Sequence, residues 1–318
     1  MRVLVAGAGG AVGQQLIPLL TRARHAVGGL LRSESKRDAL LAMGATPFFA
    51  DALDPSAVQA IVQTFRPDAI INQLTAIPQV IDLAHFDRDF ALTDRLRTEG
   101  TDNLIAAAKK VNVTRFVAQG FAGSPYARTG GGVKTEEDPF DPDPPKQFRN
   151  TFAALRHLES SVLGSFPEGG VVLRYGWFYG PRTSLSKDGP MVQAVRKRML
   201  PIVAGGTGLW SFLHIEDAAS ATLAALEGKA GIYNIADDEP ALVRDWISML
   251  AELVGAKPPF HVPAWIARML IGDHGVAMMR DNRGISNGKA KRELGWSARY
   301  PNWRDGFASE FAEHEPSL

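Results

Sequence analysis

Three glycines near the start of the chain have the spacing of a phosphate-binding turn. Gly7, Gly10 and Gly13 lie three residues apart in the segment GAGGAVG, directly after the apolar residues 2–6. Glycine at these places allows a tight turn, a close approach of backbone to a pyrophosphate and close packing of a helix on a strand. The start of the following helix adds free N–H groups and a partial positive charge. The motif therefore predicts a dinucleotide site.

The residues after the second apolar segment, 25–31, indicate which dinucleotide is bound. An acidic residue at this place would accept a hydrogen bond from the ribose 2′-hydroxyl of NAD. The chain instead has Arg32 and Ser33, followed by Lys36. A cation and a hydroxyl suit the 2′-phosphate of NADP, because a guanidinium can pair with a phosphate through two hydrogen bonds. These charges could also be the solvated start of a helix. We expect NADP in preference to NAD.

Further cofactor contacts are expected from the loops after the other strands. Asp51 ends the third apolar segment, 45–51, and could bond the adenine edge or cap the next helix. The residues expected to contact the cofactor are Gly7, Gly10, Ala11, Val12, Gly13, Arg32, Ser33, Lys36, Asp51, Ala52, Leu53, Leu74, Thr75 and Tyr175.

The elements that position these residues alternate along the chain. A helix is predicted from about residue 12 to residue 24, and further helical segments lie between apolar runs. The predicted strands are residues 2–6, 25–31, 45–51, 68–74, 114–120 and 169–176. Strands that alternate with helices imply right-handed crossovers and a parallel sheet covered on both faces. The predicted fold class is therefore α/β, a Rossmann doubly wound parallel sheet with a smaller, mainly helical C-terminal substrate lobe.

Two later regions depart from the alternation. Residues 123–148 are rich in Gly, Pro and Asp, which predicts a mobile loop in which Lys134 is a solvated charge or a lid residue over the substrate. Helical segments then dominate at residues 191–199, 215–227 and 243–254. We expect an NAD(P)-binding domain over residues 1–180, to which about 205–240 return, and a smaller substrate lobe over 181–318.

Composition restricts the partners. The 35 basic and 34 acidic residues nearly cancel, so neither nucleic acid nor a membrane surface is expected as a partner. No run approaches the roughly 18 apolar residues of a membrane span, and the absence of cysteine excludes disulfides and thiolate metal sites. His214 has no second histidine one turn away, and no metal is expected. We expect a cytoplasmic protein that binds a small-molecule substrate.

Several longer segments carry a family resemblance. They are RFV at residues 115–117, LRYGWFYGP at 173–181, FLHIEDAA at 212–219, GIYNIADDEP at 231–240 and NGKAKRELGW at 287–296. With the glycine turn, these segments resemble the extended or atypical branch of the short-chain dehydrogenase/reductase superfamily, also called the NAD-dependent epimerase/dehydratase family. The resemblance runs nearly end to end and implies a nicotinamide-dependent enzyme.

The residues that carry out proton transfer in that family are absent here. The family uses a serine and a Tyr-x-x-x-Lys pair, in which tyrosine transfers a proton and lysine lowers its pKa. Residues 118–122, where the serine should follow a strand, read AQGFA. Depending on the register, the tyrosine and lysine positions hold Thr151 and Leu155 or Phe152 and Arg156. The family's acid–base mechanism is therefore not expected to apply. Tyr126, Arg156 and Tyr175 are candidate substitutes, each with a packing or surface role as its alternative.

Three functions remain open. The first is an NAD(P)-dependent oxidoreductase or epimerase/dehydratase-like enzyme that acts on a small organic substrate with non-standard acid–base residues. The second is a non-catalytic NADP-binding sensor or partner-binding protein, because the proton-transfer residues are missing. The third is a sugar-nucleotide epimerase or reductase, whose substrate phosphates could meet the basic residues 196–198. The helices expected at 94–110 and 152–162 could form a homodimer, or they could pack on the sheet.

Overall fold

The computed structural model describes residues 1–311, and its centre is a parallel sheet of seven strands. The strand order is β12-β7-β5-β4-β1-β2-β3, and all neighbouring pairs are parallel. The strands are β1 (Arg2–Ala6), β2 (Ala26–Leu31), β3 (Thr46–Phe49), β4 (Ala69–Asn72), β5 (Arg115–Phe121), β7 (Gly170–Tyr175) and β12 (Gly231–Ile235). The predicted Rossmann sheet and its first six strands are confirmed.

The inner strands are apolar along their whole length because both of their faces are covered. Val3, Leu4 and Val5 of β1 have no exposed surface, and neither have Ile70 and Ile71 of β4. Such continuous apolar runs are typical of parallel sheets between two layers of helices.

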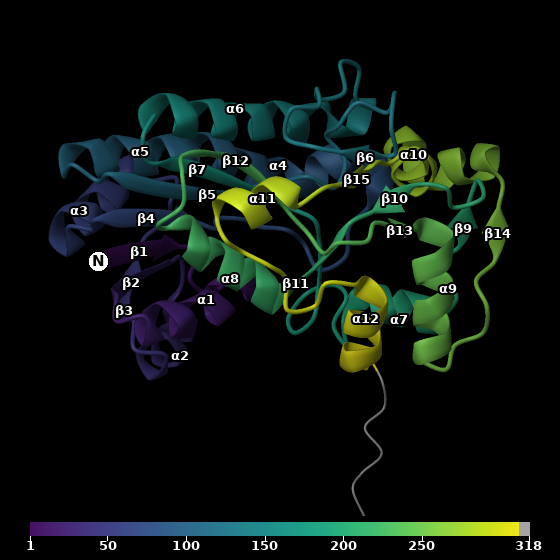
Figure 1. Ribbon diagram of the computed structural model, residues 1–318, viewed down its shortest axis with the longest axis horizontal. Coiled ribbons are helices and arrows are strands. Elements are labelled where there is room, and N and C mark those ends of the chain that lie inside the picture. Colours follow the sequence, from purple (N-terminus) through teal and green to yellow (C-terminus); the bar gives the residue numbers. More distant parts are fainter. Residues whose placement is uncertain (312–318) are drawn as a thin grey trace, which may run out of the picture.

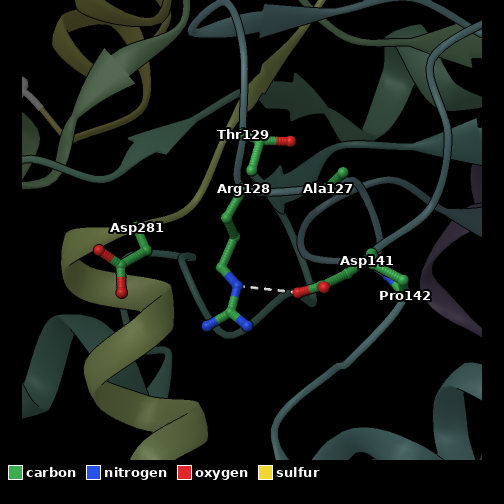
Figure 2. A pocket seen from close by; sticks show the side chains of 6 residues that line it. All are labelled: Ala127, Arg128, Thr129, Asp141, Pro142 and Asp281. Atoms are coloured by element: carbon green, nitrogen blue, oxygen red, sulfur yellow. Dashed lines mark ion pairs between the residues drawn. The ribbon is translucent and has the colours of Figure 1, made fainter.

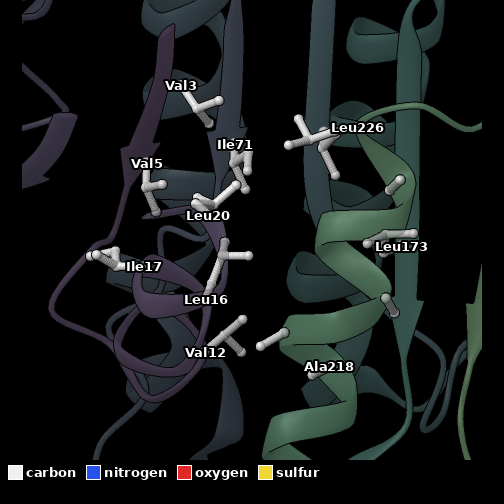
Figure 3. Packing of buried hydrophobic residues seen from close by; sticks show 14 of the residues in the cluster. Val3, Val5, Val12, Leu16, Ile17, Leu20, Ile71, Leu173, Ala218 and Leu226 are labelled. Carbon is white, nitrogen blue, oxygen red and sulfur yellow. The ribbon is translucent and has the colours of Figure 1, made fainter. Parts of the chain in front are cut away.

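Helices cover the two faces of the sheet as separate layers (Figure 1). One layer contains α1 (Ala11–Arg22), α2 (Arg37–Ala42), α8 (Ile215–Ala225) and α11 (Gly288–Glu293). The other contains α3 (Pro55–Phe65), α5 (Thr101–Lys110) and α6 (Arg149–Ser165), with α4 (Phe86–Arg95) packed on α6. Figure 3 shows the first layer, where Leu16 of α1 and Ala218 of α8 point into one apolar cluster with Val5, Ile71 and Leu173 from the strands.

The C-terminal lobe lies beside the sheet and has its own core (Figure 1). Trp210, Phe212, Trp246, Trp303 and Phe307 are fully buried in it. Its helices are α7 (Pro190–Arg196), α9 (Val243–Leu253), α10 (Ala264–Arg280) and α12 (Trp303–Phe311). Short strand pairs complete the structure: β8 (Trp177–Tyr179) with β11 (Phe212–His214), β9 (Ile202–Val203) with β14 (His261–Val262), β10 (Leu209–Trp210) with β13 (Ala241–Leu242), and β6 (Val133–Lys134) with β15 (Gly284–Ile285).

The strand order places a ligand site next to β1. From β1 the chain builds the sheet first toward β3, and it then returns to the other side of β1 with β4. Dinucleotides bind outside the carboxyl ends of the strands at such a switch point. Within residues 1–311 no helix is both long and apolar enough to span a membrane.

The segment 123–148 is better anchored than its composition suggests. It contains β6, and the carboxylate of Glu136 accepts a hydrogen bond from the backbone N–H of Asn234 at 2.6 Å. The prediction that Lys134 is a solvated charge is wrong, because its side chain is only 5% exposed. The Lys134 ammonium donates to the Thr129 carbonyl at 2.8 Å and pairs with Asp138 at 3.2 Å. These local partners compensate for its burial.

Candidate active site

The glycine turn after β1 has the geometry that a dinucleotide requires. Gly7 has a φ of +85°, and a Cβ there would lie 2.4 Å from the Gln73 carbonyl oxygen. Gly13 is equally restricted, because its Cβ would lie 2.6 Å from the Ala8 carbonyl oxygen. Gly10 precedes α1, and no side chain caps that helix. The backbone N–H groups of the first turn, at Ala11 and Val12, are therefore left for a phosphate. The turn fits a bound pyrophosphate.

Positive charge gathers beside this turn at the end of β2. Arg32, Ser33 and Lys36 are exposed there, as the NADP prediction requires. The Lys36 ammonium donates a hydrogen bond to the Gly9 carbonyl at 2.5 Å, so a cation lies directly at the glycine turn. The nearest acid along the chain, Glu34, pairs with Arg37 at 3.2 Å. This end of the site suits an additional phosphate.

The loop after β3 contains Asp51, for which two roles were possible: bonding the adenine edge and capping the next helix. Asp51 accepts a hydrogen bond from the Leu53 amide at 2.9 Å and shapes the loop. The cap of α3 is Asp54, which accepts from Ser56 and Ala57, so the capping role proposed for Asp51 is wrong. Sequence alone did not separate two aspartates that lie three residues apart. Ala52 is buried, and its carbonyl accepts a hydrogen bond from the Asn103 side chain at 2.9 Å.

Residues after β4 and β7 meet at the centre of the sheet edge. The Asn72 side chain accepts a hydrogen bond from the Leu74 amide at 3.1 Å, and the half-buried Thr75 follows. The Gln73 amide donates to the Tyr175 hydroxyl at 3.2 Å.

The Tyr175 hydroxyl also lies 2.6 Å from the Thr222 hydroxyl on α8. Tyr175 is 1% exposed, and burial raises its pKa to about 12. The burial of the Tyr175 hydroxyl and its hydrogen bonds favour a structural role for this residue.

Two registers were considered for the family's tyrosine and lysine on α6, and the structure locates all four side chains. Thr151, Phe152 and Leu155 point into the protein, whereas Arg156 is exposed with its guanidinium 6.0 Å from the Phe152 ring. An exposed Arg156 is not placed to replace an internal lysine. No phenol or amine is present at these positions of α6.

A buried polar cluster occupies the place beside Thr151. The Thr151 hydroxyl donates to the Asp94 carboxylate at 2.8 Å, and the Arg97 guanidinium donates to the same carboxylate at 3.3 Å. Burial raises the pKa of Asp94, while Thr151 and Arg97 lower it. Arg97 lies in a π-helical turn, Leu96–Gly100, which connects α4 with α5 and is a feature often found at functional sites. Sequence analysis missed Asp94 and Arg97, because they join Thr151 only when α4 packs on α6.

The third catalytic candidate, Tyr126, belongs to another buried network. Its hydroxyl accepts a hydrogen bond from Arg174 at 2.7 Å and donates to the Asn234 side chain at 2.7 Å. Arg174 in turn binds Glu159 of α6 through two hydrogen bonds of 2.6 and 2.7 Å. Tyr126 is 3% exposed, and burial raises its pKa to about 12. Tyr126 and Glu159 therefore connect α6 to the sheet.

The wall around the start of α6 is aromatic. Phe86, Phe90, Phe148 and Phe152 form a buried cluster, against which the partly buried Phe121 packs from the end of β5. The imidazole of His274 stacks on Phe148 with a centroid distance of 4.7 Å, and burial lowers its pKa to about 4. Phe121 contacts Trp177 edge to face at 5.2 Å, and Trp177 stacks on Trp210 at 3.9 Å. Phe86, Phe90, Phe148 and Phe152 are only 1–7% exposed, so their rings mainly contact one another.

A separate hollow of about 370 Å³ lies between the 123–148 segment and the end of α10 (Figure 2). Arg128 and Asp141 form an ion pair of 2.8 Å across it, and Asp281 lines it from the end of α10. Asp281 pairs with Arg280 at 2.8 Å. The charges that line this hollow thus neutralise one another. The basic residues 196–198 lie elsewhere, and Arg198 donates to the Pro258 carbonyl at 3.0 Å.

Comparisons with known proteins agree with this geometry. The family model described as "NAD dependent epimerase/dehydratase family" matches residues 3–236. A 3-diazoavenalumate denitrifying reductase from a Streptomyces species is 39% identical over 314 residues, which cover 98% of this chain and 100% of that protein. A 4-hydroxy-2-methyl-3-oxo-4-farnesyl-3,4-dihydroquinoline-1-oxide ketoreductase from Stigmatella aurantiaca is 24% identical, with 94% and 92% covered.

The fold is shared with solved epimerases. The UDP-glucose 4-epimerase of Thermotoga maritima superposes with a TM-score of 0.78 at 20% identity, covering 98% of this chain and 97% of that one. The Thermus thermophilus UDP-glucose 4-epimerase, solved with NAD, has a TM-score of 0.75 at 23% identity, with 98% of both chains covered. The chain belongs to the NAD-dependent epimerase/dehydratase family and is an NAD(P)-dependent enzyme of the oxidoreductase or epimerase type.

Proposed function

We propose that this enzyme is an NADPH-dependent reductase that delivers hydride to a diazonium group on a flat aromatic substrate and releases N₂. One observation carries the proposal: the glycine turn has the geometry that a dinucleotide requires, while neither register considered for the family's proton-transferring pair, Thr151 with Leu155 or Phe152 with Arg156, supplies a phenol and an amine. Reduction of a carbonyl requires a proton at oxygen, but reduction of a diazonium ion does not. The 39% identity to a denitrifying reductase that acts on a diazo compound supports the same chemistry.

The net reaction needs no acid from the protein. The reduced nicotinamide supplies a hydride; its C–H bond breaks, the substrate gains a hydrogen, the C–N bond of the diazonium group breaks and N₂ leaves. The products are NADP⁺, the hydrogen-substituted arene and N₂, so atoms and charge balance without a proton donor. Tyr126 and Tyr175, whose hydroxyls are buried, are then supporting residues.

The chain's own residues would bind and orient the two reactants. The uncapped first turn of α1 would hold the pyrophosphate, and Arg32 and Lys36 would hold the 2′-phosphate. The partly buried Phe121 would lie against the aromatic ring of the substrate, and the buried phenylalanine cluster on which it packs would exclude water. Aromatic faces also attract a cation, by about 0.5–2 kcal/mol for each ring.

The proposal is tested with NADPH and a benzenediazonium salt. NADPH oxidation is followed by absorbance and N₂ release by membrane-inlet mass spectrometry, with enzyme-free solution and Gly7→Ala protein as blanks. We expect one N₂ for each NADPH oxidised, at a rate well above both blanks, and slower turnover with NADH. Release of N₂ at the blank rate, or NADPH oxidation only with carbonyl substrates, would overturn the proposal.

A further inference from the structure

We propose that α6 selects for a diazonium substrate because it presents neither a phenol nor an amine at positions 151, 152, 155 and 156. This inference rests on the proposed function and concerns the same site. A diazonium ion couples with phenols to give azo compounds and with amines to give triazenes. The family's tyrosine and lysine would be such nucleophiles. Their absence would then protect the enzyme during turnover.

Two of these residues, Thr151 and Leu155, are chemically inert toward this electrophile. Leu155 is a hydrocarbon without exposed surface. Thr151 is an aliphatic alcohol, 1% exposed, whose hydrogen is directed to Asp94 at 2.8 Å. Asp94 is in turn paired with Arg97, so the cluster brings no free amine and no phenol to the start of α6.

The tyrosines around the strand ends are enclosed. Tyr126, Tyr175 and Tyr179 are all at most 3% exposed. Coupling proceeds through the phenolate, and burial raises the pKa of Tyr126 and of Tyr175 to about 12, which disfavours that form. The Lys134 ammonium is held by Thr129 and Asp138. The 318-residue chain contains no cysteine, the side chain with the most reactive sulfur nucleophile.

The phenylalanines near the start of α6 are also inert toward a diazonium ion. Phe148 and Phe152 are buried hydrocarbon rings, and Phe152 meets Phe140 edge to face at 5.5 Å. Phe121, which packs against this cluster and is partly exposed, likewise forms no covalent bond with a diazonium group. The absence of a phenol and an amine, which removes proton transfer, therefore suits a diazonium substrate that would modify the family's tyrosine and lysine covalently.

The test restores a nucleophile and measures a covalent adduct in the absence of hydride transfer. Thr151→Tyr and Phe152→Tyr proteins are saturated with NADP⁺ and treated with a benzenediazonium salt. In Thr151→Tyr the terminal nitrogen would bond to the ring carbon beside the phenol oxygen, and the ring proton would leave to solvent. We expect a visible azo absorption and an added aryl-N₂ mass on the peptide that contains residues 149–156. Thr151→Phe is the matched control of similar size.

The outcomes separate this inference from the proposed function. Phe152→Tyr adds only one hydroxyl to a residue of the aromatic cluster at the start of α6. This variant still tests the inference if Thr151→Tyr does not fold. We expect labelling of that peptide at least tenfold above the wild-type and Thr151→Phe proteins. Equal labelling of all proteins, or none in the folded tyrosine variants, would overturn the inference even if the wild type releases N₂ with NADPH. Labelling without NADPH-dependent N₂ release would overturn only the proposed function.

Discussion

The two ends of the dinucleotide site differ in what they retain. At the pyrophosphate end, Gly7 is restricted by the Gln73 carbonyl, α1 is uncapped and Lys36 lies at the turn. On α6, neither Thr151 nor Phe152 offers a phenol, and the Thr151 hydroxyl donates to the Asp94 carboxylate. Under the proposed function, this difference means that cofactor binding and proton transfer are separable in this fold. A site that keeps only the first could then perform hydride transfer to a group that needs no proton.

The largest expected effect concerns the ion pair between Arg174 of β7 and Glu159 of α6 at the nicotinamide end. Glu159→Ala leaves the Arg174 guanidinium buried without its two carboxylate hydrogen bonds of 2.6 and 2.7 Å. We expect the free energy of unfolding to fall by about 3–5 kcal/mol. Chemical denaturation measures it, and Glu168→Ala on the exposed surface is the control. A loss as small as that of the control would mean that this pair does not anchor α6.

The next effect tests the pyrophosphate end. Gly7→Ala places a Cβ 2.4 Å from the Gln73 carbonyl oxygen and requires an unfavourable φ of +85°. We expect NADPH affinity to fall by roughly 100-fold, about 2.7 kcal/mol. Isothermal titration calorimetry measures this affinity. Gly164→Ala, where a Cβ meets nothing within 4 Å, is the matched control and should bind normally. Equal affinity of the two variants would contradict the assignment of the turn.

A smaller effect is expected on the preference for NADPH over NADH. Lys36→Glu reverses the charge that lies at the Gly9 carbonyl. We expect the Kd for NADPH to rise about tenfold, roughly 1.4 kcal/mol, while the Kd for NADH changes little. Lys109→Glu, an exposed site on α5, controls for net charge. If both cofactors weakened equally, Lys36 would support the turn and would not contact a 2′-phosphate.

The smallest effect concerns pH. Burial raises the pKa of Tyr126 and of Tyr175 to about 12, so both phenols stay neutral, and it lowers the pKa of His274 to about 4, so the imidazole stays uncharged. None of these groups changes its charge between about pH 6 and pH 8. We expect the rate of hydride transfer to vary less than about twofold over this range. A bell-shaped profile in single turnovers would indicate an acid or base.

The sequence signals for the pyrophosphate end are local. The glycine spacing, the apolar strands and the cations after β2 lie within 37 residues of the N-terminus. The nicotinamide end depends on residues far apart in the chain: Asp94 meets Thr151, and Phe86 meets His274 at 4.6 Å. No local pattern marks these partners. Lys134 was misjudged for a similar reason, since the loop composition does not reveal its partners.

The proposed function requires that hydride transfer proceeds without proton donation by the enzyme. The most direct measurement is a single-turnover stopped-flow experiment with a benzenediazonium salt, which isolates the chemical step from product release. The step is compared for NADPH, NADPH deuterated at C4, and NADPH in D₂O. We predict that deuterium at C4 slows NADPH oxidation and that D₂O leaves it unchanged. If D₂O slowed the step, a solvent-exchangeable proton would be transferred during hydride transfer, which would contradict the proposed mechanism.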